Sequence, residues 1–158
     1  NWFAWLSSQG YAQVGPFAYG LAGALPVAAD FDGDWIGDVA VYAGTDWTAW
    51  LSLSGYAQGG PYSYGLAGAT PVAADFDGDR LADPAVYSGT DWTAWLSAFG
   101  YPQVGPYSYG FAGAVPIAAD FDGDGIGDVA VSHQRQWYAW LSSQGYVQSG
   151  PYAFNLQE

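Results

Sequence analysis

The sequence repeats itself with a period of 45 residues. Tryptophans mark the period in two series, which are Trp2, Trp47, Trp92 and Trp137, and Trp5, Trp50, Trp95 and Trp140. Residues 26–70 and 71–115 differ at 11 of 45 positions, which leaves 34 identical. Periods of 20–50 residues are typical of solenoids, propellers and arrays, whose units bury their apolar faces against their neighbours. We therefore interpret residues 1–158 as a single repeat domain.

The repeat divides the chain into one partial and three complete units. Residues 1–25 form a half repeat with the third and fourth strands of a unit, and the complete units are 26–70, 71–115 and 116–158. In the second complete unit we expect strands at 71–74, 85–87, 92–97 and around 106–109, because Gly, Asp and Ser punctuate the gaps between these apolar segments. Apolar residues at helical spacing with capping signals are missing, so we expect almost no helix.

Four short strands in each unit predict an all-β fold. About four strands in roughly 45 residues are typical of one blade of a β-propeller. Both faces of the expected strands are apolar or aromatic, which fits sheets that are covered on both sides by neighbouring sheets. We predict a β-propeller built of four-stranded blades, with a β-solenoid as the alternative architecture.

The acidic composition excludes several classes of function. The chain has 15 acidic side chains against two basic ones, Arg80 and Arg135, and a formal net charge of −13. Binding to nucleic acid depends on clustered Lys and Arg, so we expect no nucleic-acid partner. Charge-free stretches such as 47–74 and 92–119 are broken by Gly, Pro, Ser and Gln, so we expect no membrane insertion. Cysteine is absent, which excludes disulfides and thiolate metal sites.

Three copies of one acidic loop contain most of the acidic side chains. The pattern D-x-D-G-D-x-x-x-D occurs at 30–38, 75–83 and 120–128 and includes 12 of the 15 carboxylates. Four carboxylates within nine residues repel one another unless a cation neutralises them. Calcium prefers oxygen ligands and accepts six or more of them, as in the loop of an EF-hand. The predicted ligands, with a backbone carbonyl from each apolar residue, are Asp30, Asp32, Asp34, Ile36 and Asp38; Asp75, Asp77, Asp79, Leu81 and Asp83; and Asp120, Asp122, Asp124, Ile126 and Asp128.

The cofactor that we predict is calcium, with about one ion per acidic loop and three in all. Three ions would change the net charge from −13 to −7, because each adds two positive charges. The alternative is a set of solvated acidic turns without metal, and repetition of the loop at a fixed spacing argues against it. Calcium sites of extracellular modules often have dissociation constants of about 0.1–1 mM. We therefore expect structural calcium sites in a protein located outside the cell or at its surface.

The run from Pro116 to Val131, PIAADFDGDGIGDVAV, resembles the FG-GAP/VCBS class of repeats. The resemblance covers essentially the whole chain, and the acidic loop is its specific part. It implies calcium-loaded propeller blades, as in integrin α-subunit heads, some sugar-binding lectins and many secreted bacterial proteins. It also implies calcium ligation by the Asp residues of the three loops. Two departures, Arg80 and Pro84, fall on the second loop and on the strand after it, and we expect them to weaken that site.

The number of repeats predicts association with other chains. Dividing 158 by 45 gives about 3.5 units, so one chain cannot pair its termini to close a ring in the usual way. A half unit with exposed strand edges invites pairing with another chain. Head-to-tail contacts that do not close produce filaments. We expect the chain to partner itself, in a ring or in a fibre.

Other candidate sites are less specific. Asp46 with Trp47, and Asp91 with Trp92, could hold a sugar between a carboxylate and an indole ring. The alternative for these pairs is a turn that leads into a strand, followed by a core tryptophan. His133 is the only histidine, and we expect it on the surface or in a turn rather than in a catalytic triad. We expect no enzymatic activity.

These patterns together predict a non-catalytic extracellular calcium-binding module. Its expected role is cell adhesion, or lectin-like binding of glycans or of extracellular proteins. The alternative is a structural subunit of a self-assembling extracellular fibre or surface layer. High identity between repeats, an open half unit and a surface with few charges favour that alternative.

Overall fold

The structure is a computed structural model that describes residues 1–153. Within these residues the strands form one two-stranded sheet and three four-stranded sheets, all antiparallel. The first sheet contains β1 (Trp2–Leu6) and β2 (Ala12–Phe17). The second contains β3 (Leu25–Ala29), β4 (Asp38–Ala43), β5 (Asp46–Leu51) and β6 (Ala57–Tyr62). The third contains β7 (Thr70–Ala74), β8 (Asp83–Ser88), β9 (Asp91–Trp95) and β10 (Gln103–Tyr107). The fourth contains β11 (Val115–Ala119), β12 (Asp128–His133), β13 (Gln136–Leu141) and β14 (Val147–Ala153).

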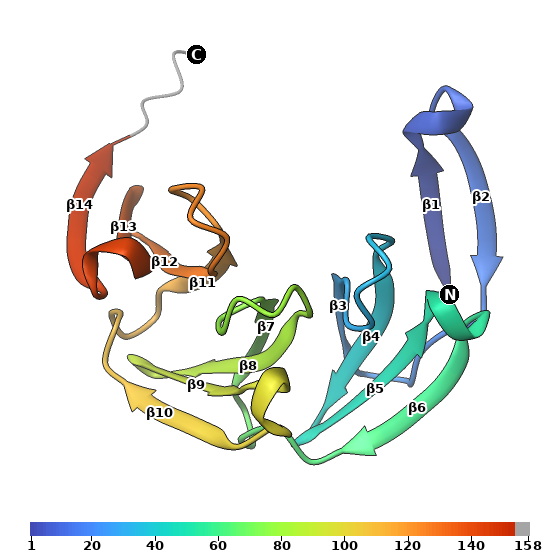
Figure 1. The fold of residues 1–158 in the computed structure, drawn as a ribbon, viewed down its shortest axis with the longest axis horizontal. Coiled ribbons are helices and arrows are strands. Elements are labelled where there is room, and N and C mark those ends of the chain that lie inside the picture. The colour runs from blue at the N-terminus through green and yellow to red at the C-terminus, as the bar shows by residue number, and fades with distance from the viewer. Residues whose placement is uncertain (154–158) are drawn as a thin grey trace.

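The four sheets follow one another around an open arc (Figure 1). The first strands of the complete units lie toward the inside of the arc, where β7 contacts both β3 and β11. The fourth strands β6, β10 and β14 lie on its outer side (Figure 1). The predicted all-β class is confirmed. The arc does not close within residues 1–153, so a complete propeller ring is not shown.

Each complete unit has its four predicted strands, and the bounds differ from the predicted ones, most clearly for the third and fourth strands. In the third sheet, β9 ends at Trp95, although we expected a strand to 97, and β10 begins at Gln103 rather than near 106. The reason is a tight reversal at Gly100, which adopts a left-handed φ of 80° that a glycine accepts without steric cost. Gln103, shortly after this reversal, already pairs with Trp95 in the antiparallel ladder.

Short 3₁₀ turns follow the third strand of every unit. They are η1 (Ser7–Gln9), η2 (Ser52–Ser54), η3 (Ser97–Phe99) and η4 (Ser142–Gln144). The expectation of almost no helix is confirmed, because these three-residue turns are the helical segments of residues 1–153. Nothing helical in that range has the length and apolar character needed to cross a membrane.

The core lies between the sheets rather than within one of them. One buried cluster joins the second and third sheets and includes Tyr42, Trp47, Val86 and Trp95. Another joins the third and fourth sheets; it contains Val72, Tyr87, Trp92, Val129, Val131 and Trp140. Because the strands are apolar on both faces, each sheet needs a neighbour on each side to remove that surface from water.

Trp5 and Trp95 occupy the same position of the repeat but differ in exposure. We therefore expect their replacement by alanine to change the free energy of unfolding by different amounts. Trp95 is 6% exposed between two sheets, whereas Trp5 in the first sheet is 58% exposed. Trp95→Ala should lower the free energy of unfolding by about 3–5 kcal/mol, since it leaves a cavity. Trp5→Ala should cost less than about 1 kcal/mol. Urea unfolding of both variants in one buffer measures the difference, and equal losses would contradict this account of the core.

Candidate metal centres

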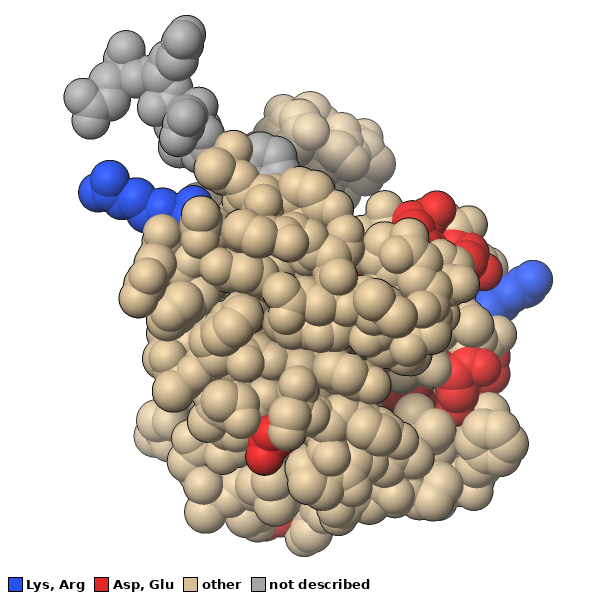
Figure 2. All heavy atoms as spheres, turned by 90° about the vertical axis from the view of Figure 1, so that its left-hand side faces the viewer, with Lys and Arg blue, Asp and Glu red and all other residues tan. Residues whose placement is uncertain are grey.

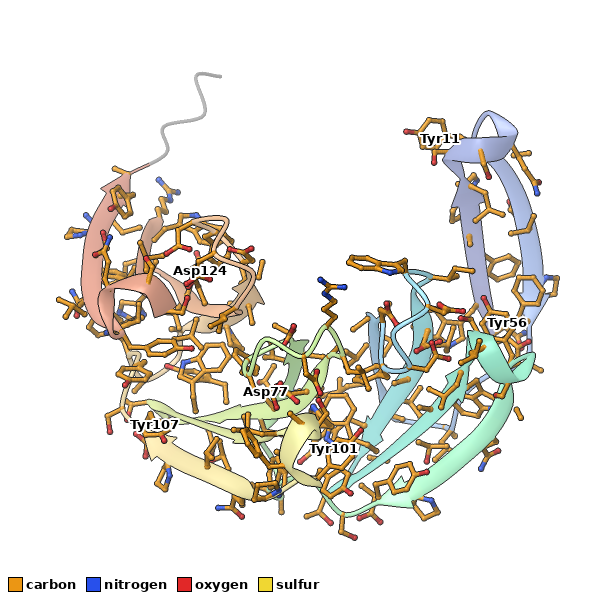
Figure 3. All side chains as sticks on the ribbon, in the orientation of Figure 1. Tyr11, Tyr56, Asp77, Tyr101, Tyr107 and Asp124 are labelled. Atoms are coloured by element: carbon orange, nitrogen blue, oxygen red, sulfur yellow. The ribbon has the colours of Figure 1, made fainter. Side chains whose placement is uncertain are left out.

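The acidic loops join the first and second strands of the three complete sheets. Each loop ends on an Asp that opens the second strand, at Asp38, Asp83 and Asp128. The loops project at one side of the arc, where Asp77 and Asp124 are visible in two of them (Figure 3). A space-filling view shows most of the visible acidic surface near one edge and smaller acidic spots lower on the face, while the remaining visible surface is largely uncharged (Figure 2).

The carboxylate of the first Asp in each loop accepts hydrogen bonds from backbone N–H groups later in the same loop, which keeps the loop compact. In the first loop, Asp30 Oδ1 accepts a hydrogen bond from the Gly33 N–H at 2.6 Å, and Oδ2 accepts one from the Trp35 N–H at 2.8 Å. Gly33 has a φ of 82°, a backbone conformation that glycine adopts readily and that makes this tight turn possible. The geometry of this turn therefore explains why all three copies of the D-x-D-G-D pattern contain a glycine at this position.

The last Asp of each loop is buried and ties the loop to the 3₁₀ turn of the same unit. Asp38 is 1% exposed. Its Oδ2 accepts from the Phe31 N–H at 2.7 Å and its Oδ1 from the Ser52 N–H at 2.6 Å. Asp83 and Asp128 accept the equivalent pairs of hydrogen bonds in their own units. These carboxylates position the acidic loop against the turn that follows the third strand.

Three carboxylates of each loop converge closely enough to share one cation. They are Asp30, Asp32 and Asp38; Asp75, Asp77 and Asp83; and Asp120, Asp122 and Asp128. In each group one oxygen per residue lies within 4.8 Å of the others. The side chains that each group offers to a cation are all carboxylates, whose oxygens are the ligands that hard divalent ions prefer.

One oxygen of the first group lacks any partner. Asp32 Oδ2 accepts from the Leu53 N–H at 3.0 Å, but Asp32 Oδ1 is buried and has no hydrogen bond within residues 1–153. A buried oxygen without a partner is costly, because it has lost its water and gained nothing in return. A bound cation would satisfy this atom, so the residues present fit a metal ion.

The second Asp of the D-G-D sequence, Asp34 in the first loop, bonds to the 3₁₀ turn instead. Asp34 Oδ2 accepts from Ser52 Oγ at 2.7 Å, and its Oδ1 accepts from the Ile36 N–H at 2.8 Å. Asp79 and Asp124 make the same bonds to Ser97 and Ser142. These three Asp residues, predicted as ligands, do not belong to the converging groups. The carbonyl ligands expected of Ile36, Leu81 and Ile126 stay a prediction.

Burial raises the pKa of three loop carboxylates, those of Asp38, Asp77 and Asp83. The pKa of Asp83 is raised to about 6, chiefly because burial removes its water, while hydrogen bonds from Ser97 and Phe76 oppose the shift. Burial raises the pKa of Asp38 and of Asp77 for the same reason. In the third loop, hydrogen bonds from the Gly123 and Gly125 N–H groups lower the pKa of Asp120. A divalent cation would favour the ionised form of every carboxylate near it.

Contacts between successive loops were not predicted from the sequence. The Ala82 N–H in the second loop donates to the Asp30 carbonyl in the first at 2.7 Å, and the Gly127 N–H of the third loop donates to the Asp75 carbonyl. The serines of the 3₁₀ turns were also missed, although Ser52, Ser97 and Ser142 recur at the repeat period. Their recurrence directly after a Trp-Leu pair was the signal that could have revealed them.

Arg80 and Pro84 do not break up the second group of carboxylates. Asp75, Asp77 and Asp83 converge as the other two groups do. The Arg80 guanidinium lies 5.9 Å from the ring centre of Trp35, in the preceding loop. Pro84 lies within β8, opposite Ala73 of β7. The arginine therefore adds a second contact between neighbouring loops.

The weaker candidate sites are not part of the carboxylate groups. Trp47 and Trp92 are each 3% exposed, and their indole N–H groups donate to the carbonyls of Tyr64 and Tyr109, respectively. Their ring faces are thus covered by protein and are not offered to a sugar. Asp46 Oδ1 accepts from Ser63 Oγ at 2.8 Å, and Asp91 Oδ1 from Ser108 Oγ at 2.7 Å. His133 stacks on Phe111, with ring centres 5.4 Å apart.

An apolar cavity lies between the third and fourth sheets. Its volume is about 280 Å³, and its wall includes Trp92, Tyr109, Val129 and Tyr146. The wall contains no charged side chain. The ionisable side chains in its wall are those of Tyr107, Tyr109 and Tyr146.

Comparison with protein-family models matches the family described as Carcinustatin peptide. The matched segments are residues 14–21, 59–66, 104–111 and 149–156. Four segments of eight residues are 32 of the 158, so this similarity does not assign the chain to a family. Searches of the curated proteins and of the solved structures found no match. The matched segments repeat every 45 residues, and each begins in the fourth strand of a unit.

Metal-free protein should lose stability as the pH rises from about 4 to about 6. Asp83 has an ordinary pKa of 3.8 in the unfolded chain and about 6 in the folded one. Between these values the folded chain holds a proton that the unfolded chain has released, so each rise in pH favours unfolding. Urea unfolding in EDTA at several pH values between 4 and 7 measures this. A free energy of unfolding that rises over the interval would contradict the assigned burial of Asp83.

Proposed function

We propose that the protein is a non-catalytic, calcium-stabilised repeat module of the FG-GAP/VCBS kind that acts outside the cell in adhesion, by binding glycans or other proteins. Its sheets are the blades of a propeller in this proposal. The observation that carries it is the same group of three carboxylates at the same place in three consecutive sheets. The partnerless Asp32 Oδ1 in the first group supports a bound ion.

Calcium suits these groups better than other common cations. All the converging side-chain ligands are carboxylates, and softer metals prefer the imidazole and thiolate ligands that are not present here. Magnesium retains most of its water and demands strict octahedral geometry. Calcium tolerates irregular oxygen cages, such as a carboxylate group completed by carbonyls and water.

The calcium ions have a structural role in this proposal. Each carboxylate group joins the loop to the 3₁₀ turn of its own sheet, through Asp38 and its equivalents. Successive loops are bonded to each other, as Ala82 is to Asp30. A cation that holds one loop in shape thereby supports the contact between two sheets. No comparable group of ionised side chains lines the apolar cavity, and the module is non-catalytic in this proposal.

Adhesion is supported by a row of half-exposed aromatic rings on the outer strands. The row has one ring per unit at the repeat spacing, and consists of Phe17, Tyr62, Tyr107 and Tyr152, which are 40–48% exposed. Tyr107 lies on the outer side of the arc (Figure 3). Neighbouring polar groups, such as Ser108 bonded to Asp91, accompany the rings. Aromatic faces beside hydroxyl and carboxylate groups suit the apolar and polar sides of a sugar ring.

A second candidate function is self-assembly into an extracellular fibre or surface layer. The specific observation in its favour is the uncovered aromatic surface of the first sheet, where Trp5 is 58% and Tyr11 is 69% exposed. The equivalent surfaces of the other three sheets are covered by a neighbouring sheet.

Calcium should bind with a stoichiometry of three and should stabilise the fold. We expect EDTA to lower the melting temperature by several degrees or more, because an ion that binds only the folded chain stabilises it. Asp77→Asn should reduce the stoichiometry to two, whereas Asp91→Asn, outside the loops of the same unit, should leave it at three. Isothermal titration calorimetry and thermal unfolding measure both. Absence of calcium binding to the unaltered chain would refute the calcium proposal.

Glycan binding should depend on the outer row of rings. Replacing Tyr62 and Tyr107 together by Ala should abolish retention on those glycans that the unaltered chain binds on an array, because two stacking platforms are lost. Leu53→Ala provides the control, since Leu53 is 72% exposed and lies outside the row. If the double variant binds the same glycans unchanged, the row is not the adhesive surface.

A further inference from the structure

We propose that the exposed aromatic surface of the first sheet, formed by Trp5 and Tyr11, is a docking site for the aromatic arm of a second copy of this chain. The arm is the sequence Gly-Pro-aromatic-Xaa-aromatic that ends each unit, at 15–19, 60–64 and 105–109. This inference deepens the second candidate function, because it names the surface through which the copies join.

The junction between the second and third sheets shows how an arm binds. Tyr64, the last ring of its arm, stacks on Tyr101 of the next sheet with ring centres 5.0 Å apart and planes at 15°. It also contacts Trp95 of that sheet at 6.1 Å. Tyr62, the first ring of the arm, stacks on Tyr64 from the other side at 5.8 Å. One aromatic ring is thus held between its own arm and a Trp–Tyr pair of the following sheet.

The other two junctions repeat this arrangement. Tyr19 of the first arm lies 5.5 Å from Tyr56 and 5.7 Å from Trp50. In the last junction, Tyr109 lies 5.7 Å from Tyr146 and 5.9 Å from Trp140. Three junctions with the same three rings establish one mode of contact between successive units.

The first sheet carries the same Trp–Tyr pair without an arm. Trp5 is 58% exposed, whereas its equivalents Trp50, Trp95 and Trp140 are 7%, 6% and 5% exposed. Tyr11, the equivalent of Tyr56, is 69% exposed. It lies at the far end of the first sheet and points into the opening of the arc, while Tyr56 and Tyr101 lie against neighbouring sheets (Figure 3).

The uncovered pair already has the geometry of a covered one. Tyr11 has a left-handed φ of 61°, compared with 62° for Tyr56 and 64° for Tyr101. Its N–H donates to the Leu6 carbonyl at 2.8 Å, as the Tyr56 N–H does to Leu51. A left-handed φ at a tyrosine costs about 1 kcal/mol or more. The first sheet therefore presents a preformed platform, and little conformational entropy is lost when an arm docks.

A second copy of this chain supplies the matching arm. Within residues 1–153 the first three arms pack against a following sheet, and no described sheet follows the one that ends in β14, where the fourth arm begins. Its residues Gly150, Pro151 and Tyr152 repeat the spacing of Gly105, Pro106 and Tyr107. Tyr152 is 48% exposed, close to the 47% of Tyr107 in an engaged arm. The contact extends the interface between sheets from one chain to the next.

The net charge of each copy determines the solution conditions in which this contact forms. Its aromatic rings are uncharged, but two copies that each carry −13 repel each other. Salt screens this repulsion. Three calcium ions would reduce it further by lowering each charge to −7. Association should therefore be stronger in calcium or at raised ionic strength.

Sedimentation velocity of the full chain over a range of concentrations, in calcium, tests the proposal. The unaltered chain should associate reversibly, and Trp5→Ala and Tyr11→Ala should each weaken association by about 30-fold, a loss typical of truncating a central aromatic anchor. Trp35→Ala is the matched control, because Trp35 is 78% exposed and lies in an acidic loop, where it contacts Arg80 and none of the stacked rings of the junctions. Unchanged circular dichroism and melting temperature show that each variant is folded.

A free peptide with the sequence of residues 104–111, VGPYSYGF, provides a second test. It should quench tryptophan fluorescence of the unaltered chain and compete with its association, and a scrambled peptide and the Trp5→Ala chain should show neither effect. A chain that stays monomeric at millimolar concentration, or equal losses in Trp5→Ala and Trp35→Ala, would overturn the inference. Closed particles of a few copies that require Trp5 would uphold the docking site and overturn the fibre. Binding of a glycan rather than the peptide at Trp5 would overturn the second copy as occupant.

Discussion

Every sheet of this protein depends on its neighbours to cover its aromatic residues. The second tryptophan of the third strand is buried where an arm from the preceding unit reaches across, as Trp50, Trp95 and Trp140 show. Trp95 between two sheets and Trp5 on the first sheet have the same sequence context but differ almost tenfold in exposure. Contact between units, rather than the strength of any single sheet, therefore stabilises the fold.

The acidic loops also contribute to the contact between neighbouring sheets. Their carboxylates are buried or crowded together, and hydrogen bonds from backbone N–H groups satisfy many of their oxygens. Because one loop is bonded to the next, a cation in one loop acts on the contact between two sheets. Metal binding and packing of the sheets are therefore coupled in the proposed function, and the ion contributes to the rigidity of the arc rather than to chemistry.

Much of the fold and part of the site could be predicted from the sequence. The period marked by the tryptophans indicated repeated four-stranded units, and the D-x-D-G-D-x-x-x-D pattern indicated three equivalent acidic loops. The pattern could not show that Asp34 bonds to Ser52 while Asp30, Asp32 and Asp38 converge, since Ser52 is 18 residues away from Asp34. Nor could it show that Trp47 is buried under a carbonyl of its own arm, because an exposed and a buried tryptophan have the same sequence signal.

The sequence by itself determined the number of units, their boundaries and their strands, because these follow from local periodicity and turn residues. It also determined which carboxylates stand close together along the chain. Only the tertiary structure decided which of them converge, which aromatic rings are covered, and that the four sheets form an open arc. The physical reason is that burial and hydrogen bonding join residues of different strands and different units. The spacing of residues within one unit contains no information about what its neighbour covers.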